Sequence, residues 1–158
     1  MYIFICENSP NGILTGVYDA WSLKIEKNCS HADIFLLSEQ PDNYELFNEF
    51  YTVNPSPIKT EKVASTLRRK LGQDFYDKIL SAILAVELSS KKKMDKANAV
   101  YQTIVTALHS PHGAKVLEHL GNPYIYRVFE LSRATASEAH HLKGFLRFSE
   151  LKNGILFS

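Results

Sequence analysis

The side chains best suited to chemistry lie near the end of the chain, in "SEAHHLKGFLRF" at residues 137–148. Glu138, His140 and His141 are residue types that act as general acids and bases near neutral pH. On a helix, Glu138 and His141 are three residues apart and share a face, whereas the adjacent histidines diverge by about 100°. A metal site shared by the two histidines is therefore not expected. Glu138 with His140 or His141 is the catalytic candidate.

The same stretch also has a purely structural interpretation. Cations and imidazoles in the last turn of a helix are stabilised by the negative end of the helix dipole, by about 0.3–1 kcal/mol each when exposed. This explains His140, His141 and Lys143. It does not explain Arg147, which is expected in a following strand between Leu146 and Phe148. A cation there lies either at an exposed strand edge or in a binding site.

Basic residues cluster elsewhere in the second half of the chain. Arginine is the better phosphate ligand because its planar guanidinium can donate two parallel hydrogen bonds. The "LRRKL" stretch contributes Arg68 and Arg69, and the lysines of "SSKKKMDK" are expected to be a solvated helix start. The candidate nucleic-acid-binding residues are Arg68, Arg69, Arg127, Arg133, Lys143 and Arg147.

The formal net charge of +1 hides a strong asymmetry between the two parts of the chain. Residues 1–57 carry two Lys or Arg against eight Asp or Glu, a balance of −6, and residues 58–158 carry sixteen against nine, a balance of +7. A chain polarised in this way can present a basic surface to a polyanion although its total charge is close to zero. The alternative is that these charges only solvate helix faces.

The sequence lacks the motifs of several common enzyme activities. No Walker loop, GxGxxG or GxSxG is present, which argues against nucleotide hydrolysis and acyl transfer. Cys6 and Cys29 form no metal or cluster pattern and are expected to be structural thiols. His109, His112 and His119 lie in or near "HSPHG", a stretch that interrupts the helical pattern. No HExxH motif or cysteine pair accompanies them. No metal or other cofactor is therefore predicted.

Length and composition indicate one soluble globular domain over residues 1–158. The early apolar run "YIFIC" is too short to cross a bilayer and lacks the flanks of a signal peptide, so a cytoplasmic location and no membrane partner are expected.

The first third of the chain predicts strands around one helix. "MYIFICE", "ADIFLLSE" and "LFNEFYTV" have the composition of strands, the third least clearly. Between the first two, Ile13, Val17 and Trp21 have helical spacing from Gly12 to about Lys24. Trp21 is expected in the core rather than on a binding surface.

From Pro57 onward the pattern is helical. Apolar residues at helical spacing predict one helix that ends near Gly72, a second over Phe75–Val86, and a third over Ala97–Leu108. A short helix is expected around Val116–Leu120. Asn122 and Pro123 have the residue types of a helix cap and first position, and the last helix is expected to continue from there to Gly144.

After Gly144 the period changes to that of a strand. "FLRFSELKNGILF" alternates and contains Asn153-Gly154, a strong hairpin signal, but only four residues follow. We therefore expect this chain to be the N-terminal portion of a longer protein. The predicted fold class is α+β, with a small sheet from the N-terminal strands and this C-terminal hairpin packed on a predominantly helical middle and C-terminal part.

Two stretches, "ICENSPNGILTGVYDAW" and "VFELSRATASEAHHLKGFLRF", resemble an uncharacterised bacterial family of probable DNA metabolism proteins. The matching positions are Glu7, Gly12, Leu14, Val17, Arg133, Glu138, Ala139, His140, Lys143, Phe145, Arg147 and Phe148. The resemblance implies a DNA repair or modification context, a radical-SAM protein as companion, and in some relatives a uracil-DNA-glycosylase-like domain. It implies no catalytic residues.

Three hypotheses follow from the sequence. The preferred one is an accessory nucleic-acid-binding component that acts with a radical-SAM partner. The second is an enzyme that acts on DNA or a damaged base through Glu138 and His140 or His141, with Arg147 orienting a phosphate. The third is an adaptor whose basic face docks an acidic protein.

Overall fold

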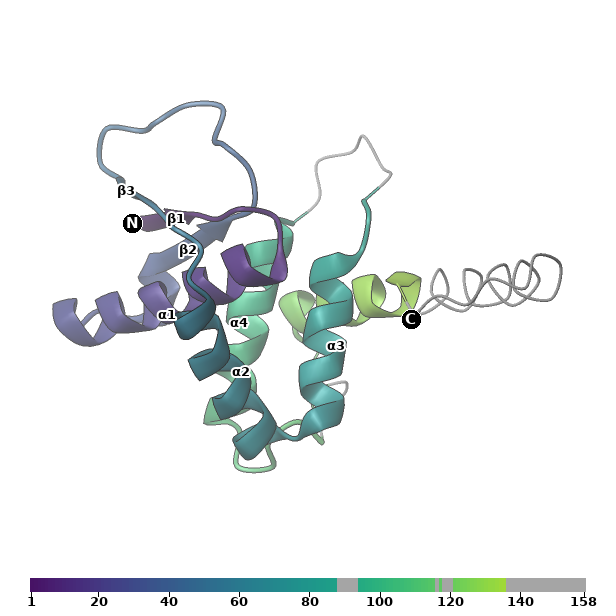
Figure 1. Ribbon diagram of the computed structural model, residues 1–158. Helices are drawn as coiled ribbons and strands as arrows, with labels where there is room; N and C mark the ends of the chain where they lie inside the picture. Colours follow the sequence, from purple (N-terminus) through teal and green to yellow (C-terminus); the bar gives the residue numbers. More distant parts are fainter. Residues whose placement is uncertain (88–93, 116, 118–120, 136–158) are drawn as a thin grey trace, which may run out of the picture.

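A computed structural model of the chain describes residues 1–87, 94–115, 117 and 121–135 (Figure 1). The strands are β1 (Tyr2–Ile5), β2 (Ile34–Leu37) and β3 (Glu49–Thr52). The helices are α1 (Pro10–Lys27), α2 (Pro57–Leu71), α3 (Gln73–Leu84) and α4 (Lys96–His109), with a short 3-10 turn, η1 (His31–Asp33), before β2. A further helix begins at residue 123 and is described to residue 135.

The three strands form one parallel sheet in the order β2-β1-β3. Phe4 pairs in register with Leu36 on one side and with Tyr51 on the other, so these three side chains lie on the same face. Phe4 and Leu36 are buried, and α1 covers this face with Gly16 against Leu36. The predicted α+β class and the sheet from the N-terminal strands are confirmed. The predicted C-terminal hairpin lies outside the described residues.

Local sequence signals set where the helices begin. Ser9 and Ser56 cap α1 and α2 through their side chains, and each is followed by proline at the first helical position. Asp95 caps α4 in the same way. The Asn122 side chain accepts hydrogen bonds from the Tyr124 and Ile125 amides, as its predicted capping role requires.

Buried polar side chains fix how the helices sit on the sheet. The Thr15 hydroxyl, fully buried on α1, accepts a hydrogen bond from the Ser56 amide at 3.0 Å and thereby fixes the start of α2. The Asn98 side-chain oxygen accepts a hydrogen bond from the Leu36 amide at 3.2 Å. Because β2 is an edge strand, this contact from α4 satisfies a backbone donor that the sheet leaves unpaired.

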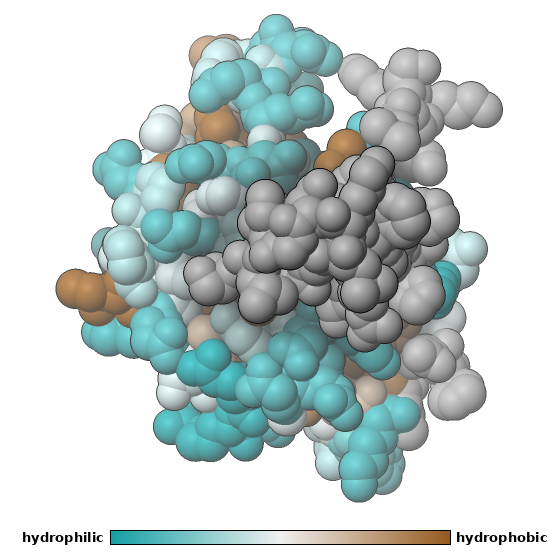
Figure 2. All heavy atoms as spheres, turned by 45° about the vertical axis from the view of Figure 1, so that its right-hand side comes forward, coloured by the Kyte–Doolittle hydropathy of each residue, from teal (hydrophilic) through white to brown (hydrophobic). Residues whose placement is uncertain are grey.

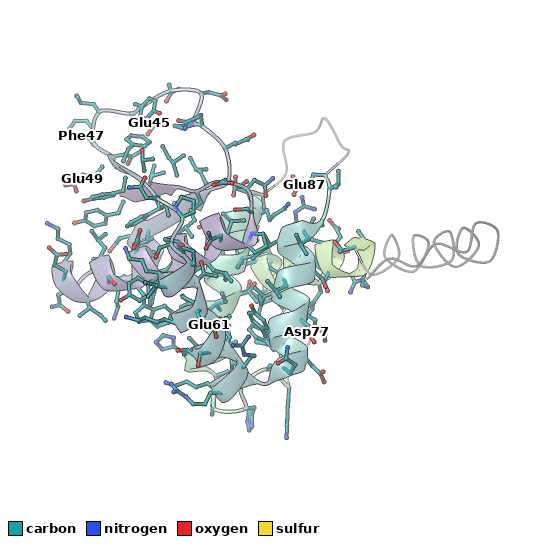
Figure 3. The ribbon with its side chains drawn as sticks, in the orientation of Figure 1. Glu45, Phe47, Glu49, Glu61, Asp77 and Glu87 are labelled. Carbon is teal, nitrogen blue, oxygen red and sulfur yellow. The ribbon has the colours of Figure 1, made fainter. Side chains whose placement is uncertain are left out.

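Acidic residues are concentrated around the connection from β2 to β3. Residues 38–49, which contain the connection from β2 to β3, hold four Asp or Glu and no Lys or Arg. Figure 3 shows Glu45 and Glu49 in the upper part of the molecule, whereas Figure 1 shows α2 descending to the opposite end. Among the coloured residues of Figure 2, hydrophilic ones predominate and hydrophobic ones appear in small groups.

Candidate nucleic-acid interface

The structure describes only part of the predicted site. Glu138, His140, His141, Lys143 and Arg147 lie outside the described residues, and so do Lys91, Lys92 and Lys93. Of the predicted phosphate ligands, Arg68, Arg69, Arg127 and Arg133 lie within them.

Arg127 is a buried structural residue and does not lie on an outer face with the other cations. Its side chain is only 9% exposed. The guanidinium forms ion pairs with Glu87 and, at 2.6 Å, with Glu130. With two carboxylates beside it and little contact with solvent, this guanidinium is not available to a phosphate. The sequence did not indicate this burial, because Glu87, forty residues away in the chain, supplies one of the two carboxylates.

The remaining arginines do not share one surface. Arg68 lies on α2 with its guanidinium 5.0 Å from the Tyr76 ring of α3. Arg133 is exposed on the helix that begins at residue 123, which contacts the Lys78 and Ser81 side of α3. Positions 76 and 78 are about 200° apart around a helix, so the two arginines lie on opposite sides of α3.

The basic residues of α2 form the strongest positive feature in the described part of the chain. The helix carries five Lys or Arg and one Glu, a balance of +4. Lys59 pairs with Asp19 at 2.7 Å, and Arg68 pairs with Glu61 at 2.8 Å.

Three exposed cations of α2, namely Lys62, Arg69 and Lys70, have no ion-pair partner within the described ranges. Lys62 and Arg69 are seven residues apart and therefore point the same way from the helix. The connection after α4 lies at the end of α2, where Gly113 faces Leu71, and it brings the exposed Lys115 to the same end of the molecule. We call Lys62, Arg69, Lys70 and Lys115 the basic α2 face.

Aromatic rings on α1 and α4 lie next to this face. The Lys62 ammonium is 5.9 Å from the centroid of the Tyr18 ring. Trp21 follows Tyr18 by three residues on α1, and its ring lies 6.2 Å from the His109 ring with the planes only 15° apart. Trp21 is partly buried and packs against the core without belonging to it. The sequence expectation placed it inside.

His31 holds the inner side of this ring cluster. Its ring meets Trp21 edge-on at 4.5 Å between centroids, and its Nδ1 forms a hydrogen bond with the hydroxyl of the fully buried Tyr101. The His31 Nε2 is buried without a partner among the described residues. Burial, followed by the nearby Lys24 and His109, lowers the pKa of His31 to about 4. The imidazole is therefore neutral at pH 7.

The His31 pKa predicts a loss of stability in mild acid. The unfolded chain binds a proton at His31 below its ordinary pKa of 6.5, whereas the folded chain binds it only near pH 4. The free energy of unfolding therefore falls as the pH drops from about 6.5 towards 4, by roughly 1–2 kcal/mol after allowance for solvent screening.

Urea denaturation of the wild type and of His31→Asn at pH 7.5, 6.5, 5.5 and 4.5 checks this prediction. Asparagine keeps a polar atom near the Nδ1 position but does not titrate. We expect the variant to lose less stability than the wild type over this range. Parallel pH profiles for the two proteins would contradict the prediction.

A cavity of about 1210 Å³ lies at the carboxyl ends of β1 and β2. Its wall combines residues that follow these strands with the end of α3 and the start of α4, among them Asn8, Ser38, Ala85, Asp95, Lys96 and Tyr124. Carboxyl ends of parallel strands are a common place for ligands in α/β proteins, and sequence reasoning missed this cavity.

Lys96 is the cation of this cavity, and it is buried rather than part of a solvated helix start. The residue as a whole is only 4% exposed. The ammonium donates hydrogen bonds to the carbonyl oxygens of Ile83 at 2.8 Å and Ala85 at 2.7 Å, and to Asn8 Oδ1 at 3.3 Å. Burial lowers the pKa of Lys96. Because an ammonium has three protons, these contacts use its whole donor capacity.

The carboxylates of the cavity outnumber its cation. Glu39, Asp42, Glu87 and Asp95 line it together with Lys96, and Glu87 is also paired with Arg127. The Asp95 carboxylate is occupied by the Ser38 amide and hydroxyl and by the Ala97 amide. A phosphate would have to displace the existing partners of Lys96 here. The basic α2 face is therefore the better anion site.

The described residues contain neither a candidate metal site nor a candidate membrane-spanning helix. No group of three or more His, Cys, Asp or Glu side chains in these ranges is placed to hold a metal ion, and His119 lies outside them. No helix in the described part of the chain combines the length and the apolar character needed to cross a membrane.

Comparison with known protein families gives a match over part of the chain. A family model for a domain of unknown function, DUF4130, matches residues 94–158. The matched region contains α4 and the helix that begins at residue 123, but none of the strands and not α2. No curated protein and no solved structure matches the chain.

Proposed function

We propose that this chain is an accessory DNA-binding component of a DNA repair or modification system. The observation that carries the proposal is the basic α2 face, because Lys62, Arg69 and Lys70 are exposed there and no carboxylate among the described residues pairs with them. The resemblance of the two quoted stretches to probable DNA metabolism proteins supports DNA as the polyanion.

The distribution of charge favours one orientation on a polyanion. The basic α2 face lies at one end of the molecule, and the four carboxylates of residues 38–49 lie towards the other (Figures 1 and 3). A dipolar molecule of this kind turns its positive end to a phosphate chain and keeps its negative end away from it. A surface of interspersed charges, which serves only to solvate a helix, would give no such orientation.

The chemistry of the system is assigned to a partner. The family resemblance implies a radical-SAM companion, and an accessory subunit would present DNA to it. If the basic α2 face instead docked an acidic surface of that companion, DNA and the companion would compete for this face. An enzymatic role through Glu138 and His140 or His141 depends on residues outside the described part of the chain.

Loss of two cations from the basic α2 face is expected to weaken DNA binding. Arg69→Ala combined with Lys70→Ala removes two phosphate contacts, so we expect about tenfold lower affinity in 50 mM salt. Fluorescence anisotropy of a labelled DNA 20-mer measures the change. Circular dichroism shows whether the fold is kept, as it should be for two exposed side chains.

The matched control also removes two positive charges, but from the side of α3 that faces away from Arg68 and α2. Lys78→Ala combined with Arg133→Ala has the same net charge as the first variant, and both side chains are exposed. We expect it to retain the affinity of the wild type within about twofold. An equal loss in the two double variants would show that only the net charge of the chain matters, and would overturn the assignment to α2.

A further inference from the structure

The rings of Trp21 and His109 form a platform that the fold does not fully cover. Their centroids lie 6.2 Å apart with the planes 15° from parallel. Rings in close face-to-face contact lie nearer than this, so at 6.2 Å each ring leaves part of its π-face uncovered by the other. His109 is exposed and Trp21 is partly exposed, so both residues of the platform reach solvent.

The platform is held in place before any ligand arrives. The His109 Nδ1 donates a hydrogen bond to the Val105 carbonyl at 2.8 Å, which fixes the imidazole on the last turn of α4. On the inner side, His31 braces the edge of Trp21 and is itself held by the buried Tyr101. Rings that are fixed in this way lose little conformational entropy when a ligand stacks on them.

Two cations lie close to residues that neighbour the platform. Tyr18, one turn before Trp21 on α1, lies beside Lys62 of the basic α2 face. Lys24, one turn after Trp21, is close enough to His31 to act on its pKa. An ordered aromatic platform with positive side chains nearby matches the pattern by which proteins hold a nucleic acid strand, with its bases on the rings and its phosphates on the cations.

We infer that Trp21 and His109 stack an unpaired nucleobase, so that the nucleic acid bound by this chain is single-stranded or contains an extruded base. In a duplex, both faces of each base are covered by neighbouring bases and cannot reach a protein ring. The inference rests on the proposed DNA-binding function and names the substrate class of the same surface.

Trp21 itself gives the readout, because it is the only tryptophan of the chain. The probes are a thymidine 20-mer, a duplex of the same length, and inorganic polyphosphate as a polyanion without bases. We expect the single strand to quench Trp21 fluorescence and to bind about tenfold more tightly than the duplex. Polyphosphate is expected to compete with the single strand but to leave the fluorescence unchanged.

His109→Ala tests the platform without removing a core side chain, because His109 is exposed. We expect this variant to bind the single strand about tenfold more weakly and to keep the duplex affinity. His112→Ala is the matched control, since it removes an exposed histidine three residues further on. We expect His112→Ala to bind both probes as the wild type does.

The outcomes separate the inference from the proposed function. If single strand and duplex bind equally and neither quenches Trp21, the stacking inference is overturned while DNA binding stands. Quenching by polyphosphate equal to that by the single strand overturns it as well, because bases would not be needed. Absence of binding to either DNA overturns both.

Discussion

Lys96→Met is expected to lower the free energy of unfolding by about 3 kcal/mol. The ammonium satisfies the carbonyl oxygens of Ile83 and Ala85 where α3 ends, and these bonds measure 2.8 and 2.7 Å. Methionine fills a similar volume but leaves two buried acceptors without a donor, each at a cost of about 1–3 kcal/mol. Removal of a buried charge offsets part of this loss, because the desolvation of the ammonium is no longer required.

Urea denaturation at pH 7 measures the effect, and Lys115→Met is the matched control. Lys115 belongs to the basic α2 face. Because its side chain is exposed, its replacement should change the free energy of unfolding by no more than about 0.5 kcal/mol. A loss for Lys96→Met as small as that for Lys115→Met would show that Lys96 does not hold the end of α3.

Gly12→Ala is expected to destabilise the fold by about 3 kcal/mol, against the usual trend for helices. Alanine is normally favoured over glycine inside a helix by about 1 kcal/mol. Here a Cβ at position 12 would collide with the Glu7 carbonyl oxygen and lie 2.7 Å from Glu7 Cβ. The Ser9 amide binds the same carbonyl at 2.9 Å, and the Cys6 amide binds the Leu37 carbonyl at 2.7 Å. The backbone at Glu7 therefore has little freedom to retreat.

Thermal and urea unfolding of Gly12→Ala should be compared with Ser22→Ala. Ser22 is exposed on the same helix, so this control gains helix propensity without a steric conflict. We expect the control to be as stable as the wild type or slightly more stable. A Gly12→Ala protein as stable as the control would show that α1 does not approach the Glu7 backbone as closely as the structure has it.

The elements of the fold could be predicted largely from local sequence. All three N-terminal strands and the helices that follow were expected, because their apolar residues recur with clear periods and the breaks contain capping serines and prolines. The ends of two helices differ from the predicted ones. Helix α1 begins at Pro10 because Ser9 caps it, and α3 ends at Leu84, so Val86 lies beyond the helix and is 61% exposed.

The arrangement of the sheet could not be predicted in the same way. Its parallel pairing and its order β2-β1-β3 depend on contacts between strands that are far apart in the chain. A strand pattern alone does not specify its neighbours, since the same alternation can pair in either direction. The cavity at the carboxyl ends of the strands is a consequence of that topology and was missed with it.

The candidate site was predicted best where a charge depends only on its own helix. Arg69 is exposed at the end of α2, as its position in "LRRKL" indicates. The burial of Arg127 and Lys96 was not expected, because their partners, Glu87 and the carbonyls at the end of α3, come from other elements. Trp21 shows the same limit, since the ring of His109 that lies beside it comes from a helix more than eighty residues away.

The most direct test of the central claim is the salt dependence of DNA binding by the wild-type chain. The dissociation constant for a labelled single-stranded 20-mer is measured by fluorescence anisotropy between about 50 and 200 mM salt. In this range, counterion release makes the logarithm of the association constant fall linearly with the logarithm of the salt concentration. Four cations on the basic α2 face predict a slope of about −3 for the logarithm of the association constant against the logarithm of salt concentration. A slope near zero would contradict the claim that this face holds a phosphate chain.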